Sequence, residues 1–265
     1  MRQLLTTRGI HTVEELEERV KAYQTGRRAF EETAAWGASE LTEVLPAPEG
    51  LVTRIANLEA QATERGWLDG LPHEVVVVSL GQLRAFQFTV DRPYANSFRT
   101  EAHASVETLG AITLPDQPPA FPLQVSGDGA GLTVSAPGPN LRVQAMSLEG
   151  QAGGRTRLTV DLTFGSPFVQ VAEFQGTMLL KNGYHRAFSL IAQGVTYAPV
   201  LLVHCTNYAQ TGAAGQGFFS GAVVMGEKPP LLKHFLSPFA IEFNAVDLHK
   251  AIRFRPDEFQ LAVPE

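Results

Sequence analysis

The nine residues from Leu180 to Phe188, LKNGYHRAF, lie between two strongly patterned segments and decide how the chain around them folds. Two β-type runs, residues 168–174 and 177–181, precede the motif, and the pair Gln175-Gly176 between them favours a tight hairpin turn. The motif therefore begins where a predicted hairpin ends.

A helix is predicted to begin within this stretch, because Asn182 is well suited to cap a helix and Gly194 to end one. Its apolar stripe at helical spacing consists of Ala187, Leu190 and Ile191. A strand at residues 198–203 follows, so the sequence predicts a hairpin, a turn, a helix and a further strand.

The turn has the chemistry of an anion site. The first N–H groups of a helix have no acceptor within the helix, and the positive end of the helix dipole favours negative charge. His185 and Arg186 add side-chain donors, and the small Gly183 would let a ligand approach the backbone. We therefore predict a phosphate-binding site at Asn182, Gly183, His185 and Arg186.

The order of these features resembles the core of the ParB/sulfiredoxin-like fold over about residues 168–204. The resemblance rests on the hairpin, the Gly-x-His-Arg turn at Gly183–Arg186, the helix, Gly194 and the strand that begins at Pro199-Val200. It implies a nucleotide-phosphate pocket at Gly183, His185 and Arg186 that binds ATP or CTP, with Mg²⁺ in some members.

Two positions depart from that family. Tyr184 stands where sulfiredoxins carry a cysteine, which argues against sulfinic-acid reduction, and Asn182 stands where related amino-acid kinases carry an acidic residue. The segment Asp91–Arg99 is similar to the arginine-bearing stretch that precedes the core in that family. The resemblance therefore implies that Arg99, or Arg92, reaches the same ligand.

Glu173, at the end of the predicted hairpin strand, and His185 are the candidate catalytic residues. A carboxylate there could act as a general base or a Mg²⁺ ligand. The alternative is structural: Glu173 is a solvated strand-end carboxylate, and Arg186 is a surface residue paired with it. Cys205 beside His204 is not expected to act with it as a nucleophile and base, because consecutive strand residues point to opposite faces.

The rest of the chain predicts an α+β protein with three segments in one composite domain. Residues 1–70 are expected to be helical, 71–165 to be β-rich, and 166–265 to hold the ParB/sulfiredoxin-like unit with a C-terminal extension. The expected helices are an amphipathic one at 12–23, an Ala- and Glu-rich one at 26–43, one after Pro48, and a short one within 229–235. The expected strands are 74–78, 86–90, several between 104 and 164, 240–243 and 251–254.

The composition constrains partners and compartment. A formal net charge of -6 in 265 residues disfavours non-specific nucleic-acid binding. A single cysteine, Cys205, rules out an intrachain disulfide and fits a reducing, cytoplasmic compartment. The N-terminal sequence has no apolar run of the length that a signal peptide or membrane span needs, so we expect a protein that is neither exported nor membrane-spanning.

The leading hypothesis is a nucleotide-phosphate-binding protein, which as an enzyme would be an NTP-dependent phosphotransferase or NTP hydrolase. One alternative is a non-catalytic interaction module whose β-rich middle binds a protein partner. A third is a DNA-associated protein of the partitioning type. The sequence leaves the oligomeric state open.

Overall fold

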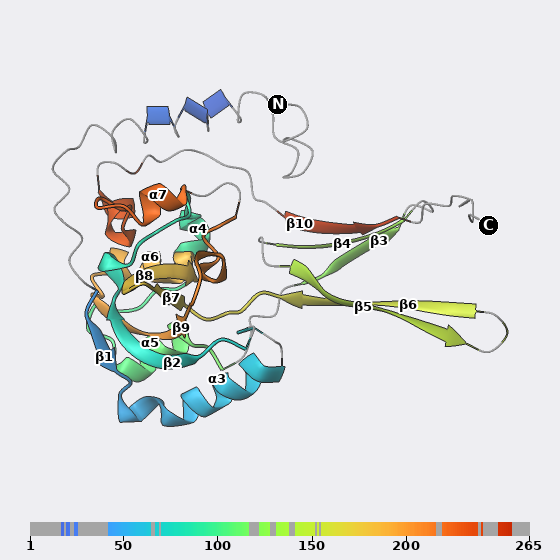
Figure 1. Cartoon of the computed structure of the whole chain (residues 1–265), viewed down its shortest axis with the longest axis horizontal. Helices are drawn as coiled ribbons and strands as arrows, with labels where there is room; N and C mark the ends of the chain where they lie inside the picture. The colour runs from blue at the N-terminus through green and yellow to red at the C-terminus, as the bar shows by residue number, and fades with distance from the viewer. Residues whose placement is uncertain are drawn as a thin grey trace. The chain divides into compact units, whose positions relative to one another are not determined.

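The computed structural model describes residues 42–64, 67–68, 70–116, 122–127, 131–137, 141–151, 153, 155–215, 219–237, 240 and 249–255, together with residues 17, 18, 20, 21, 24 and 25. The chain divides into two compact units, and helices and sheets together make it an α+β protein (Figure 1). The α/β unit is Arg19–Pro118 with Ser166–Phe243. The β unit is Met1–Glu18, Pro119–Gly165 and Asn244–Glu265.

The α/β unit is built on a five-stranded sheet in the order β1-β2-β9-β7-β8. Its strands are β1 (Val44–Pro46), β2 (His73–Ser79), β7 (Gln170–Phe174), β8 (Thr177–Asn182) and β9 (Tyr197–His204). Strands β7 and β9 run parallel, and the other neighbours run antiparallel. A parallel pair needs a crossover between its strands, and β8 and the following helix provide it.

The predicted hairpin, helix and strand around the motif are confirmed. Gln175 and Gly176 both have positive φ, 52° and 72°, as a two-residue hairpin turn requires. The helix α6 (Tyr184–Ala192) connects β8 to β9, and Gly194 follows it with φ 85°. Local sequence signals were therefore sufficient to predict this part of the fold.

Helices cover both faces of the sheet. On one face α5 (Val106–Thr113) and α6 pack on alternate strand residues such as Val76 and Val200. On the other face α3 (Val52–Glu64) and α7 (Gly221–Val224) pack on the residues between them, such as Val75 and Leu201. Because both faces are covered, β9 is a continuous apolar run rather than an alternating one.

The β unit contains a three-stranded sheet and a separate hairpin. The sheet has the order β10-β4-β3, from His249–Phe254, Leu132–Pro137 and Gln124–Gly127. The hairpin consists of β5 (Leu141–Gln151) and β6 (Arg155–Phe164). The predicted strands at 132–134, 141–146, 157–162 and 251–254 are thus confirmed, whereas the one at 240–243 falls outside the described residues apart from Ala240.

Two predictions in the N-terminal half need correction. The segment 1–70 is not wholly helical, because β1 pairs with β2 at the sheet edge. The helix after Pro48 is present as a short 3-10 turn (Glu49–Leu51) followed by α3. The helices expected at 12–23 and 26–43 lie largely outside the described residues.

The strand predicted at 86–90 is absent, and a helix replaces strand at 106–113. Phe86 N–H donates to the Tyr184 hydroxyl at 2.8 Å, and its carbonyl accepts from Phe219 N–H at 2.9 Å, so no neighbouring strand is needed. The helix α5 is capped by Ser105 Oγ, which accepts from Thr108 N–H at 3.3 Å. In both cases a side-chain oxygen, of Tyr184 or of Ser105, accepts a main-chain N–H of the segment.

The remaining elements are short. They are α4 (Arg92–Ala95) and the 3-10 turns η2 (Leu80–Gln82), η3 (Tyr208–Thr211) and η4 (Leu232–Leu236). The last of these corresponds to the short helix expected within 229–235. The three sequence segments do not correspond one to one with the two units, because β2, α4 and α5 of the middle segment belong to the α/β unit.

Candidate anion-binding site

Gly183 makes the turn between β8 and α6 possible. Its φ of 87° and ψ of 23° lie in the left-handed region that favours glycine. A Cβ at this position would meet the Cα and Cγ2 atoms of Val169 at 2.8 Å. The absence of a side chain at Gly183 therefore lets Val169, just before β7, pack against this turn.

Asn182 has a structural role that differs from the predicted cap. Its Nδ2 donates to the carbonyls of Ser166 at 2.6 Å and Phe168 at 3.2 Å, which ties β8 to the segment entering β7. The N-cap residue of α6 is Gly183, and no side chain caps the helix. The prediction that Asn182 caps α6 is therefore wrong.

This arrangement leaves the start of α6 open. The first main-chain bond of the helix is donated by Ala187 N–H to Gly183 O at 2.9 Å. Within the described part of the chain, the N–H groups of Tyr184, His185 and Arg186 have no acceptor. Three donors and the positive end of the helix dipole thus lie together at one turn.

Arg186 lies beside these donors and is buried, with 8% of its surface exposed. Its Nη1 donates to the carbonyl of Pro167, and its guanidinium lies 4.8 Å from the ring centroid of Phe98. No carboxylate among the described residues pairs with it, so the suggested ion pair with Glu173 is absent. Burial lowers the pKa of Arg186, although an arginine stays charged in proteins.

His185 lies against the ring of Tyr94, with centroids 5.0 Å apart. Burial lowers the pKa of His185; the nearby Asp91 acts in the opposite direction, and Arg186 lowers it further. The imidazole is therefore neutral near pH 7. In that state it can donate one hydrogen bond through a ring N–H, as the sequence suggested, or act as a base.

The segment Asp91–Thr100, which carries Arg99, packs along α6. The carbonyl of Phe98 accepts from Ser189 Oγ at 3.0 Å, and Thr100 N–H donates to Gln193 Oε1 at 2.6 Å. Arg99 itself is exposed. The sequence had not singled out Asp91, Tyr94 and Phe98, although Asp91 followed by Pro93 is a helix-start signal that could have located α4.

Tyr184 points away from this turn into the core. Its hydroxyl accepts from the N–H groups of Phe86 at 2.8 Å and Gln87 at 3.4 Å, and its ring packs edge-on against Phe86. Burial raises the pKa of the phenol. Tyr184, at the position compared above with the cysteine of sulfiredoxins, is thus a buried and hydrogen-bonded core residue.

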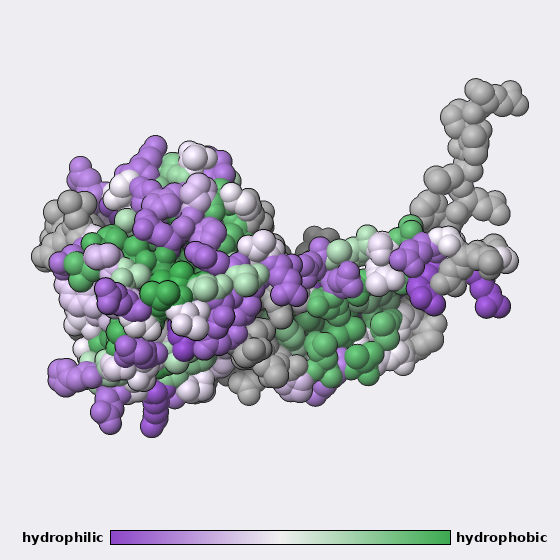
Figure 2. Space-filling model, turned by 90° about the horizontal axis from the view of Figure 1, so that it is seen from below, coloured by the Kyte–Doolittle hydropathy of each residue, from purple (hydrophilic) through white to green (hydrophobic). Residues whose placement is uncertain are grey.

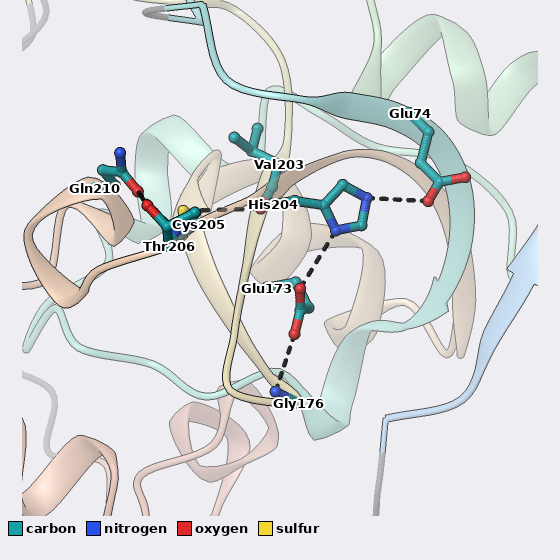
Figure 3. A network of polar contacts seen from close by, with 8 residues as sticks. All are labelled: Glu74, Glu173, Gly176, Val203, His204, Cys205, Thr206 and Gln210. Carbon is teal, nitrogen blue, oxygen red and sulfur yellow. Dashed lines mark hydrogen bonds and ion pairs between the residues drawn. The ribbon is translucent and has the colours of Figure 1, made fainter.

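Glu173 lies at the other end of β7 and belongs to a separate network (Figure 3). Gln170 pairs with Asn182 beside the α6 turn, whereas Glu173 lies three residues further along, about 10 Å at the rise of a strand. Its carboxylate contacts His204 Nδ1 at 3.3 Å and accepts from Gly176 N–H at 2.9 Å. Glu173 and His185 therefore do not lie together.

The imidazole of His204 lies between two carboxylates in this network, since Glu74 Oε1 is 3.1 Å from its Nε2 (Figure 3). Cys205 is buried, and its Sγ lies 3.8 Å from the carbonyl of Val203, away from the imidazole. Burial raises the pKa of the thiol. Among the described residues, no three His, Cys, Asp or Glu side chains are arranged to hold a metal ion.

Comparison of the chain with family models, curated proteins and solved structures found no match. Of the residues described, none forms a helix that is long and apolar enough to cross a membrane. The arguments for function therefore rest on the geometry of the α6 turn.

Proposed function

We propose that the chain binds the phosphate groups of a nucleotide at the N-terminal turn of α6. The order of hairpin, glycine turn, helix and parallel strand between Gln170 and His204 supports the proposal, since it is the order that the resemblance to the ParB/sulfiredoxin-like fold implies. The three N–H groups without acceptors provide donors that suit a phosphate.

The observation that carries the proposal is the environment of Arg186. A buried cation at the positive end of a helix, without a carboxylate partner among the described residues, is electrostatically unfavourable. An anion at the same turn would compensate both the guanidinium and the helix dipole. Hydrogen bonds to charged groups contribute about 1.5–3 kcal/mol each, so a few such contacts suffice for measurable binding.

The residues around the turn include groups that suit a nucleotide with Mg²⁺. Arg99 is an exposed arginine next to Phe98, and Asp91 is the acidic residue that acts on His185. Mg²⁺ is commonly held by one or two carboxylates together with nucleotide phosphates, and when bound it neutralises phosphate charge. Asp91 would be the carboxylate that this chain contributes.

A phosphotransferase or NTP hydrolase would also need a base near the phosphates. The neutral imidazole of His185 is the residue at the turn with that chemistry. Glu173 is excluded from that role in this proposal by its position at the opposite end of β7.

Calorimetric titration with ATP, CTP and GTP, with and without Mg²⁺, tests the proposal. We expect binding of at least one nucleotide, and an at least tenfold weaker affinity in Arg186→Met, since one charge-assisted contact corresponds to about that factor. We expect the variant to fold, because methionine retains much of the side-chain volume over Phe98. A thermal melt that matches that of the wild type checks this.

Two further variants define the site. Arg99→Ala, an exposed position, should weaken binding without changing the melting temperature of the free protein. Glu173→Gln should bind like the wild type. No heat of binding with any nucleotide, and no change in melting temperature on adding nucleotide, would refute the proposal.

A non-catalytic interaction module is the second candidate, because a specific surface favours it. Large apolar side chains of the hairpin β5–β6 are exposed, among them Met146 and Leu148 at 63% and 73%. This surface is independent of the α6 turn, and both functions are compatible in one chain.

A further inference from the structure

The hairpin β5–β6 has one wholly uncharged face. The cross-strand pairs Leu141–Phe164, Val143–Leu162, Met146–Val160, Leu148–Leu158 and Gly150–Thr156 lie on this side. We call these ten residues the apolar face. Side chains alternate along a strand, so the residues between them point to the opposite side.

A β-bulge maintains this segregation. The pairing shifts between Val143 and Ala145, where β5 has one more residue than β6. Without the extra residue, Met146 would lie on the same side as Arg142. The bulge thus restores apolar residues to one face, as expected of a register that is set by the hydrophobic pattern.

All charged residues of the two strands lie on the opposite face. They are Arg142, Glu149, Arg155, Arg157 and Asp161. Glu149 is directly opposite Arg157 in the ladder, so opposite charges are neighbours there. The apolar face consequently carries no charge that would repel an identical face.

Among the residues of the β unit that the structure describes, those that cover the apolar face lie at its base. Leu141 is fully buried with Val134 and Ala136 of β4, and Leu162 and Phe164 pack against that cluster. Further along the hairpin Met146, Leu148 and Leu158 are 63%, 73% and 53% exposed. Figure 2 shows hydrophobic surface gathered over this part of the molecule.

An exposed apolar face on an isolated two-stranded sheet is unfavourable in water. Two strands alone are marginally stable, and sheets become stable when a hydrophobic face is covered. Two such faces pack well against each other at about 10 Å, as in a β-sandwich. A partner with an uncharged apolar surface of similar width would remove the outer part of this hairpin from water.

We propose that this partner is a second copy of the chain, whose apolar face packs on the first in a two-fold symmetric dimer. The same patch then forms the interface of both subunits, so that its uncharged side chains contact the uncharged side chains of the other subunit. Stable interfaces take about 20–30 residues a side, and the apolar face without Leu141, Leu162 and Phe164 at its base provides roughly a quarter to a third of that number. The dimer is therefore weak and dissociates on dilution.

Sedimentation velocity from about 5 to 500 μM protein tests the dimer, a range that covers dissociation constants expected of small interfaces. We expect the weight-average mass to rise towards twice the monomer mass with concentration. Leu148→Glu, which places a charge on the apolar face, should keep the protein monomeric throughout. Ser147→Glu, on the opposite face, should dimerise like the wild type.

Circular dichroism spectra that match the wild type establish that both variants fold. A wild type that stays monomeric at the highest concentration would overturn the proposal, as would equal loss of dimer in the two variants. Flotation with phosphatidylcholine vesicles distinguishes a lipid surface. Vesicle binding that Leu148→Glu abolishes, in a protein that stays monomeric, would assign the apolar face to a membrane instead.

Discussion

The charged and titratable side chains at the two ends of β7 have different partners. At the end beside α6, the cation of Arg186 is buried with a carbonyl and an aromatic ring as its contacts. At the other end, the imidazole of His204 lies between the carboxylates of Glu173 and Glu74. At the second end charged groups have partners within the chain, whereas at the first end Arg186 would gain a charged partner only from the anion that we propose.

The comparison also concerns the backbone, because β8 is flanked by two glycines with left-handed φ. Gly176 has open space around the position of a Cβ, whereas Gly183 packs on Val169. One turn is a surface loop of the hairpin, and the other is a close contact that fixes the start of α6. Substitutions at the two positions should therefore differ.

The largest effect is expected from Gly183→Ala. The left-handed backbone costs a non-glycine residue about 1–2 kcal/mol, and overpacking against Val169 adds about 1–3 kcal/mol. Urea denaturation should show the sum as a lower free energy of unfolding. Gly176→Ala is the matched control, with the backbone cost alone. Equal losses in the two variants would mean that the contact with Val169 does not constrain the turn.

The next effect concerns stabilisation by ligand. A nucleotide at 100 times its dissociation constant should stabilise the wild type by about 2.7 kcal/mol. Arg186→Met should lose most of this gain, and Glu173→Gln should retain it, since only the first residue lies at the α6 turn. Thermal melts with and without nucleotide measure both. If Glu173→Gln alone lost the stabilisation by nucleotide, the nucleotide site would have to be assigned to the end of β7 that carries Glu173.

A smaller effect follows from the pKa of His185. Since burial lowers this pKa below its ordinary value of 6.5, the free protein loses stability as the pH falls through the window between 6.5 and the folded-state pKa. A bound anion favours the protonated imidazole, so nucleotide affinity should rise several-fold across the same window. Calorimetry from pH 7.5 to 5.5 should show this rise in the wild type and a flatter dependence in His185→Gln. A nucleotide affinity that decreases in the wild type as the pH is lowered from 7.5 to 5.5 would contradict this prediction.

The smallest effect is expected at the end of β7 where His204 lies between Glu173 and Glu74. Glu173→Gln removes one partner of a half-exposed imidazole, and ion pairs of this kind contribute about 0–1 kcal/mol. Glu74 is more exposed than Glu173, so Glu74→Gln should cost less still. Denaturant midpoints compare the two. A loss of several kcal/mol in either variant would show that the network supports the fold far more than its exposure indicates.

Local signals predicted the elements around the motif. The turn residues Gln175-Gly176, the apolar stripe of α6, the β-branched run of β2 and the apolar run of β9 act over neighbouring residues, so each can be recognised along the sequence. Elements whose main-chain groups are satisfied from elsewhere were not predicted. Phe86 depends on the hydroxyl of Tyr184, about a hundred residues away in sequence.

The candidate site was predicted in position and only partly in detail. The sequence located Gly183, His185 and Arg186 at a helix start. It could not show that Asn182 donates to two carbonyls, that Arg186 is buried against Phe98, or that β7 separates Glu173 from His185. These facts depend on packing between segments that lie far apart in the sequence.

The most direct test of the α6 turn follows its main-chain amides during titration with ATP and Mg²⁺. In ¹⁵N–¹H correlation spectra the largest shifts are expected at Tyr184, His185 and Arg186, whose N–H groups would donate to phosphate. Unchanged signals at these residues, with shifts confined to other parts of the chain, would contradict the assignment of the anion site to α6.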